Sequence, residues 1–89
     1  LTDTNLLNRI VRTVDPQKGD SILEIGPGDG SLTEKIFPNV REMAAIEIDP
    51  LLIKHLSIRS DLEGLQIIHG DVLLQDIEKI PISNPVRII

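Results

Sequence analysis

This sequence predicts an α/β fold, in which a parallel sheet carries helices on its faces. Short apolar segments rich in Ile, Leu and Val alternate along the chain with segments whose apolar residues recur at helical spacing. Glycine, proline or aspartate follows the strand-like segments, so turn signals bound the strands. The 89 residues contain no internal repeat, low-complexity tract or linker-like run, and they are therefore expected to form one domain.

The chain begins with a predicted amphipathic helix. Its apolar residues recur at helical spacing over residues 6–14, and Thr2-Asp3-Thr4 offers capping side chains before them. The helix should end near Asp15-Pro16, because proline restricts the residue before it. After a turn, residues 21–25 form a short apolar run that predicts a buried strand.

Four further elements continue the alternation. They are a short helix over residues 31–36 that Pro38-Asn39 breaks, a strand over residues 43–48, a helix that starts at Asp49-Pro50 and ends between residues 61 and 64, and a strand over residues 65–69. Residues 72–84 are ambiguous, with one helical turn between Leu73 and Ile77 as the only regular structure indicated. Residues 85–89 look like the opening of a fourth strand.

The helix after Asp49 has one apolar face, made of Leu51, Leu52, His55, Leu56 and Arg59. We therefore expect His55 to be a packed histidine, and His69, at a strand end, to have a structural role. No second histidine or carboxylate stands at a spacing that would make either a metal ligand, so no metal is expected. The residues expected to be solvated loop charges are Asp15, Asp20, Asp61, Glu63, Asp76 and Glu78.

The composition argues against several classes of function. Nine Lys and Arg stand against fourteen Asp and Glu, for a net charge of −5, and Phe37 is the only aromatic residue. Unaided binding of nucleic acid needs clustered cations, and a base-stacking platform needs more than one aromatic ring. The absence of cysteine excludes a disulfide framework and a thiol nucleophile. No run reaches the roughly 18 apolar residues of a membrane span and no signal pattern opens the chain, so we expect a cytoplasmic protein without a membrane partner.

The strongest functional signal is a glycine-rich loop directly after the first predicted strand. Gly26, Gly28 and Gly30 allow a tight turn whose backbone amides can approach a ligand closely. Glu47 ends the second strand, 21 residues after Gly26, where a carboxylate accepts hydrogen bonds from ribose hydroxyls. Asp71 follows the third strand. A structural turn is the alternative at each position, but three such positions at successive strand ends favour a cofactor site.

The glycine spacing distinguishes between cofactors. A dinucleotide fingerprint places its third glycine at position 31, which is Ser31 here and disfavours a nicotinamide-dependent dehydrogenase. Residues 24–30 resemble the first motif of S-adenosylmethionine-dependent methyltransferases. That resemblance implies that the loop holds the methionine and ribose part of the cofactor, and that Asp71 accepts a hydrogen bond from the adenine amine. Glu24, inside a buried strand, must be hydrogen-bonded and is expected to brace the loop.

Longer segments resemble one family, the KsgA-type ribosomal RNA adenine dimethyltransferases. They are residues 23–34, 45–49 and 69–73, and Leu1-Thr2-Asp3 resembles a segment near the N-terminus of that family. The resemblance covers essentially all 89 residues in the same order and spacing. It implies a Rossmann-like class I methyltransferase fold, with residues 1–89 as the N-terminal part of a single S-adenosylmethionine-binding domain that is truncated at its fourth strand.

The resemblance implies cofactor-binding roles only where residues match. It implies a backbone contact from Leu1, a close approach by the backbone of Gly26, and a ribose-binding carboxylate at Glu47. Ile48 would lie beside the adenine ring, and Val72 would neighbour the group that accepts from the adenine amine. The full set of expected cofactor-binding residues is Leu1, Glu24, Gly26, Gly28, Gly30, Glu47, Ile48, Asp71 and Val72.

The family dimethylates the exocyclic amines of two adjacent adenosines in 16S rRNA, so the resemblance implies small-subunit rRNA as the partner. Its catalytic Asn-Leu-Pro-Tyr motif would come just after Ile89, and its basic RNA-binding domain would also lie beyond these residues. We therefore expect no catalytic residue in this chain and no activity from it alone. The open alternatives are a non-catalytic cofactor-binding or transcription-factor-like relative, a large-subunit rRNA adenine methyltransferase, which often has Ser in place of Pro27, and the dehydrogenase.

Overall fold

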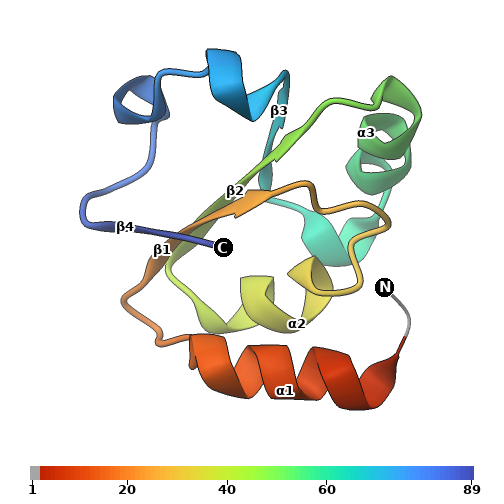
Figure 1. The fold of residues 1–89 in the computed structure, drawn as a ribbon, viewed down its shortest axis with the longest axis vertical. Coiled ribbons are helices and arrows are strands. Elements are labelled where there is room, and N and C mark those ends of the chain that lie inside the picture. The colour runs from red at the N-terminus through yellow and green to blue at the C-terminus, as the bar shows by residue number, and fades with distance from the viewer. Residues whose placement is uncertain (1–2) are drawn as a thin grey trace.

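A computed structural model describes residues 3–89, and Figure 1 shows how its strands and helices are arranged. Within this range the strands are β1 (Ser21–Ile25), β2 (Glu42–Glu47), β3 (Gln66–His69) and β4 (Val86–Ile88), and the α-helices are α1 (Thr4–Val14), α2 (Thr33–Ile36) and α3 (Pro50–Ser57). The short 3-10 turns are η1 (Phe37–Asn39), η2 (Ser60–Leu62), η3 (Val72–Leu74) and η4 (Ile77–Lys79). Leu1 lies outside the described residues, so its expected contact stays a prediction.

The strands form one parallel sheet in the order β3-β2-β1-β4. This confirms the α/β fold with a parallel sheet that the alternation of segments predicts. Ile25 at the end of β1 pairs with Ile46, and Glu47 at the end of β2 pairs with His69. The carboxyl ends of three neighbouring strands therefore meet at one edge of the sheet, where the loops that follow them can build a common site.

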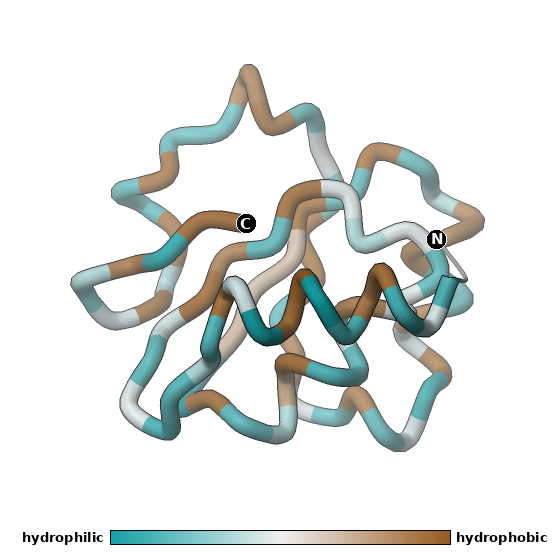
Figure 2. The backbone as a smooth tube through the Cα atoms, turned by 60° about the horizontal axis from the view of Figure 1, so that its bottom comes forward, coloured by the Kyte–Doolittle hydropathy of each residue, from teal (hydrophilic) through white to brown (hydrophobic). Residues whose placement is uncertain are grey.

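Each face of the sheet has its own apolar cluster. Ile22 and Met43 are buried on one face, against residues of α1 and α2. Leu23 and Ala44, the next residues along the same strands, are buried on the other face beneath residues 72–82. This alternation is the two-residue period of strands covered on both sides. Figure 2 shows hydrophobic strands running through the centre of the molecule, while α1 alternates between hydrophobic and hydrophilic residues.

Helix α1 has the boundaries that the sequence predicts. The Asp3 carboxylate caps its first turn by accepting a hydrogen bond from the Leu6 N–H at 3.1 Å. Asp15 ends it in the left-handed conformation, at φ 47°. Leu7 is buried and Val11 packs against the core, so the apolar face of the helix attaches it to the sheet.

Three segments differ from the sequence prediction. Helix α2 ends at Ile36 as predicted but begins at Thr33, and Pro38 lies in the first turn of η1, which follows it, where a missing N–H breaks no helical hydrogen bond. Helix α3 ends at Ser57, so the end expected between residues 61 and 64 is wrong: Arg59 lies beyond the helix, and residues 60–62 form the separate turn η2. Residues 72–84 hold two 3-10 turns, η3 and η4, instead of one helical turn.

His55 is exposed, so the packed environment expected for it is wrong. Helix α3 is only eight residues long, and Leu56 is the residue that it buries fully. Leu51, on the same expected apolar face, is 76% exposed. The spacing of apolar residues therefore predicts the helix correctly. It does not predict how much of the apolar face is covered by neighbouring elements.

No helix within residues 3–89 has the length and apolar character that crossing a membrane requires. In the same part of the chain, no three His, Asp or Glu side chains gather where they could hold a metal ion.

Candidate functional site

The loop that follows β1 turns through two glycines with open space beside them. Gly26 and Gly28 have φ angles of 68° and 59°, a conformation that residues with a side chain rarely adopt. A Cβ on either residue would meet no atom within 4 Å. The shape of the backbone therefore requires these glycines, and the space beside them is open to a ligand.

Gly30 has a different role in the same loop. It is buried at φ 87°, and a Cβ there would lie 2.7 Å from Nη1 of Arg59 and 2.8 Å from Cδ2 of Leu56. The absence of a side chain lets the loop pack closely against the end of α3. The structure places Gly30 at this packing contact and not in the lining of the hollows beside the loop, so its expected contact with a cofactor stays a prediction.

Glu47, at the end of β2, is 6% exposed and its carboxylate accepts hydrogen bonds from three backbone N–H groups. Oε1 accepts from Gly28 at 3.2 Å, while Oε2 accepts from Ile48 at 2.9 Å and from Asp49 at 3.0 Å. These bonds fix the carboxylate and tie the glycine-rich loop to the end of β2. An ionised carboxylate offers about four acceptor positions, so capacity for a further donor remains.

Residues from three strand ends line one hollow of about 130 Å³. Gly26, Glu47 and Ile48 line it from the ends of β1 and β2, and Asp71 and Val72 line it from the loop after β3. Oδ1 of Asp71 accepts a hydrogen bond at 2.9 Å from the N–H group two residues later, which holds the side chain at the start of η3. The structure thus brings five of the expected residues together around one space with apolar walls and two carboxyl groups.

A second hollow, of about 240 Å³, lies beside the same loop. Gly28, Asp29 and Ser31 contribute to its wall, together with Leu7 of α1 and Ile89, which follows β4. Ile25 and Gly26 line both hollows, so the two spaces adjoin at the beginning of the loop. An elongated ligand can therefore extend from the ends of β2 and β3 across the glycine turn.

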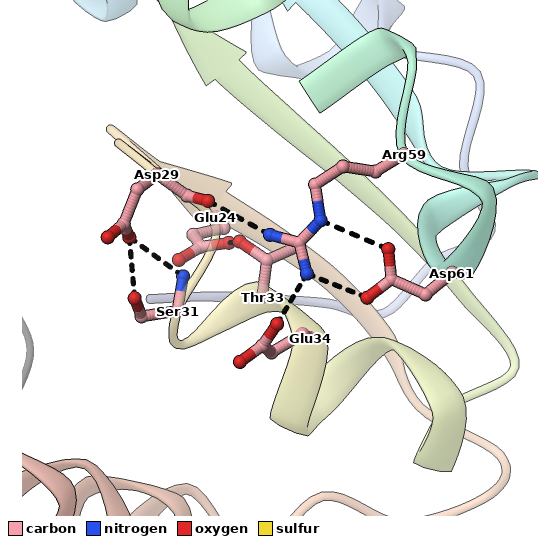
Figure 3. Close-up of polar contacts among 7 residues, drawn as sticks. All are labelled: Glu24, Asp29, Ser31, Thr33, Glu34, Arg59 and Asp61. Atoms are coloured by element: carbon pink, nitrogen blue, oxygen red, sulfur yellow. Dashed lines mark hydrogen bonds and ion pairs between the residues drawn. The ribbon is translucent and has the colours of Figure 1, made fainter. Parts of the chain in front are cut away.

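Glu24 connects β1 to the helix that follows the loop. Its side chain is 4% exposed, and its Oε1 accepts a hydrogen bond from the Thr33 hydroxyl of α2 (Figure 3). Burial raises the pKa of the Glu24 carboxyl, and the hydrogen bond from Thr33 offsets part of that shift. The expected hydrogen bond of Glu24 is confirmed, and it joins the two ends of the glycine-rich loop.

Arg59 is the residue near this site that the sequence does not reveal. Its Nη1 donates to the backbone oxygen of Asp29 at 2.9 Å, and its Nη2 pairs with Oδ2 of Asp61 at 2.7 Å. Asp61 is 54% exposed, in agreement with the solvated charge expected there, but it also forms an ion pair with Arg59. The contact with Asp29 carries no sequence signal, because a backbone carbonyl is common to every residue type.

Two other polar residues have contacts that hold the fold together. Nε2 of His69 lies 3.1 Å from the carbonyl oxygen of Ile48, in agreement with the structural role expected for this histidine. Asp20 pairs with Arg87 of β4 at 2.9 Å between Oδ2 and Nη1 and its side chain is only 20% exposed, so its prediction as a solvated charge is wrong.

The open glycine turn and the two carboxyl groups at successive strand ends fit an adenosine-containing ligand. The model of one protein family, described as ribosomal RNA adenine dimethylase, matches residues 1–88. This chain belongs to that family. The resemblance of residues 23–34, 45–49 and 69–73 to these enzymes is thereby confirmed, and membership of the family sets aside the dehydrogenase alternative.

Similar proteins cover nearly the whole of this chain but extend well beyond it. Ribosomal RNA small subunit methyltransferase A of Listeria monocytogenes is 41% identical over 81 residues, which are 90% of this chain and 28% of that protein. The protein of the same name from Streptococcus agalactiae is 42% identical over 79 residues, 88% of this chain and 27% of that protein. The chain thus spans less than a third of the length of these relatives.

Solved structures with the same fold include methyltransferases that act on RNA. A dimethyladenosine transferase from Plasmodium falciparum has a TM-score of 0.79 and 28% identity, covering 85% of this chain and 29% of that one. The 23S rRNA methyltransferase ErmE has a TM-score of 0.71 and 32% identity, covering 85% of this chain and 32% of that one. An RNA methyltransferase from Salinibacter ruber, in complex with S-adenosyl-L-homocysteine, shares the fold at a TM-score of 0.71, with 23% identity over 86% of this chain and 54% of that one. These likenesses confirm the Rossmann-like class I methyltransferase fold.

Proposed function

We propose that this chain forms the S-adenosylmethionine-binding part of an rRNA adenine dimethyltransferase. The hollow lined by Gly26, Glu47, Ile48, Asp71 and Val72 carries the proposal, because it combines a closely approachable backbone, a buried carboxylate and apolar walls at three strand ends. The family supports the class of reaction. The names of the relatives support small-subunit rRNA as the substrate. Because this chain spans less than a third of their length, we expect the RNA contacts to come from residues outside it.

Each wall of the hollow suits one part of the cofactor. The Glu47 carboxylate would accept hydrogen bonds from the ribose hydroxyls, since backbone N–H groups already hold it in place. Ile48 and Val72 would contact the adenine ring, and the Asp71 carboxylate would accept from its exocyclic amine. The turn at Gly26 would leave room for the ribose and methionine part, because no Cβ obstructs it.

When bound, S-adenosylmethionine supplies a methyl group on a sulfonium centre. Direct transfer of that group to an amine depends mainly on the position and electrostatic surroundings of the reacting atoms. The residues of this chain would bind and orient the cofactor, while groups expected just after Ile89 would hold the target adenosine. Residues 1–89 alone should therefore transfer no methyl group, and we expect the complete protein to act in the cytoplasm.

Replacing Glu47 tests the cofactor site. In the complete protein, Glu47→Ala should weaken S-adenosylmethionine binding roughly ten- to a hundred-fold, because charge-assisted hydrogen bonds to the ribose are lost. Isothermal titration calorimetry measures the change directly. An unchanged dissociation constant would refute the assigned role.

Glu42 provides a matched control at the opposite end of β2. Its Oε1 accepts hydrogen bonds from the Ser21 hydroxyl at 2.8 Å and from the N–H of Ser83, so Glu42→Ala removes comparable contacts away from the hollow. This variant should lower stability while changing the affinity by less than about twofold. Equal losses of affinity in both variants would assign the effect to the fold and not to the site.

Methyl transfer separates the remaining alternatives. With S-adenosylmethionine, the complete protein should form dimethyladenosine in small-subunit rRNA, which mass spectrometry of RNA fragments detects. Transfer to large-subunit rRNA would instead assign the chain to the branch that contains ErmE. Cofactor binding without transfer to either RNA would favour the non-catalytic relative.

A further inference from the structure

The guanidinium group of Arg59 connects the glycine-rich loop and α2 to the turn η2 that follows this residue (Figure 3). Its Nε and Nη2 donate to the two oxygens of Asp61 at 3.0 and 2.7 Å, and Nη2 also pairs with Glu34 of α2. Its Nη1 donates to the backbone oxygen of Asp29 at 2.9 Å. All three nitrogens are engaged, and the two bonds to Asp61 fix the plane of the group.

Asp29 is held from both sides by these contacts. Its carboxylate accepts hydrogen bonds from the N–H and the hydroxyl of Ser31 at 2.9 and 2.6 Å, while its carbonyl accepts from Arg59. Asp29 and Ser31 both line the hollow of about 240 Å³ beside the glycine-rich loop. A shift of the Asp29 backbone would therefore move the wall of that hollow.

The loop, the guanidinium and the start of α2 pack as one unit. The Arg59 side chain is 21% exposed, less than the 43% of Glu34 and the 54% of Asp61. Its hydrogen bonds hold the pKa of the Asp61 carboxyl below its usual value, so Asp61 stays ionised as a partner. The packing of Gly30 directly beneath Nη1 leaves no room for a side chain between the loop and the guanidinium.

We propose that Arg59 is a positioning residue for the cofactor: it keeps residues 26–31 in the shape that receives the ribose and methionine part of S-adenosylmethionine. The inference rests on the proposed function. Arg59 lines neither hollow beside the loop, so it acts through the carbonyl of Asp29 and not by touching the cofactor. A loop that is already in its binding shape loses less conformational entropy on binding, and the affinity is higher for that reason.

Arg87 offers a matched control within the same chain. Its Nη1 pairs with Oδ2 of Asp20 at 2.9 Å, and its Nη2 donates to the carbonyl oxygen of Val14. Like Arg59, it bridges a carboxylate and a backbone carbonyl. It does so near the amino end of β1, where Ser21 begins the strand, and it lines neither hollow beside the glycine-rich loop.

The test compares Arg59→Gln, Arg59→Lys and Arg87→Gln in the complete protein. Calorimetry with S-adenosylmethionine should show that Arg59→Gln raises the dissociation constant about tenfold, which corresponds to about 1.4 kcal/mol. Arg87→Gln should change it by less than about twofold, although both glutamine variants should lower the unfolding temperature. Arg59→Lys should recover part of the affinity, since an ammonium group can reach some but not all of the same acceptors.

Amide hydrogen exchange without cofactor provides a second readout. Residues 28–31 should exchange faster in Arg59→Gln than in the wild type, and at the wild-type rate in Arg87→Gln. Unchanged affinity in Arg59→Gln, or an equal loss in Arg87→Gln, would overturn the positioning role while the proposed function stands. A wild-type protein that does not bind S-adenosylmethionine would overturn the proposed function itself.

Discussion

Glu24 shows how one buried carboxyl group can tie a strand to the helix that follows a loop. Its partner is the hydroxyl of Thr33, and both side chains lie in the interior. One hydroxyl replaces only part of the water that an ionised carboxylate would otherwise bind, so burial raises the pKa of Glu24. The protonated or amide form should therefore be better suited to this position than the ionised form.

Glu24→Gln should increase the free energy of unfolding at neutral pH by about 1 kcal/mol, because an amide oxygen can still accept from Thr33 without burying a charge. The raised pKa means that the wild type loses stability as the pH rises from the unfolded value of 4.5 through the folded value. Urea unfolding at about pH 5 and about pH 8 should show this decline in the wild type and not in the variant.

Thr33→Val is the companion variant for that measurement. It keeps the shape of the side chain but removes the hydroxyl donor to Glu24. Its loss of stability relative to the wild type should therefore be largest at high pH, where the Glu24 carboxyl is ionised. If Glu24→Gln were less stable than the wild type at about pH 8, the ionised carboxylate would be favourable at this position and the argument from burial would be wrong.

The glycine-rich loop is an element whose shape depends on contacts from its surroundings. The Glu47 carboxylate accepts from the N–H of Gly28, and Arg59 donates to the carbonyl of Asp29. Within the loop, the N–H of Gly30 donates to the carbonyl of Pro27 at 3.0 Å. The loop is thus fixed by a strand end and a turn as well as by its own glycines.

Gly30→Ala should destabilise the protein more than Gly28→Ala, although both residues have positive φ angles. The Cβ of an alanine at position 28 would meet no atom, so Gly28→Ala should lower the free energy of unfolding by only about 1 kcal/mol, the cost of the left-handed conformation. An alanine at position 30 would also collide with Arg59 and Leu56, so Gly30→Ala should lower the free energy of unfolding by at least about 1 kcal/mol more than Gly28→Ala does. Urea unfolding measures both, and equal losses would mean that the guanidinium moves aside without penalty.

Several acidic side chains of this molecule, whose net charge is −5, are stabilised in their ionised form by the fold. Hydrogen bonds hold the pKa of Asp20, Asp29, Glu42 and Asp61 below their usual values, and the donors are backbone N–H groups, serine side chains, Arg59 and Arg87. The four groups lie in different parts of the fold: just before β1, in the glycine-rich loop, at the start of β2 and in η2. Acidic pH should therefore weaken contacts in several parts of the fold together.

Stability should fall as the pH is lowered below about 4. A carboxyl group with a depressed folded pKa contributes stability above its unfolded value, here 3.8 for Asp and 4.5 for Glu, and that stability is lost as the pH falls through the folded value. Urea unfolding across the acid range should show a declining midpoint. Asp20→Asn should make the decline shallower, because one of the titrating groups is gone; an unchanged slope would exclude Asp20 from the effect.

The sequence by itself determined the order of strands and helices, the boundaries of α1 and β1, and the positions of Gly26, Glu47 and Asp71 at successive strand ends. These features follow from local signals: the period of apolar residues, capping side chains, and glycine and proline at turns. A parallel sheet then brings the ends of its strands to one edge, so the edge that we propose binds the cofactor could be inferred from the sequence alone.

Only the tertiary structure decided which side chains meet across long separations. Arg59 follows α3, the helix whose end the sequence misplaced, and contacts Asp29 and Glu34, while Thr33 is the partner that Glu24 required. The exposure of His55 likewise depends on how much of α3 its neighbours cover. Such contacts depend on the packing of whole elements and often involve backbone carbonyls, which no residue type marks in a sequence.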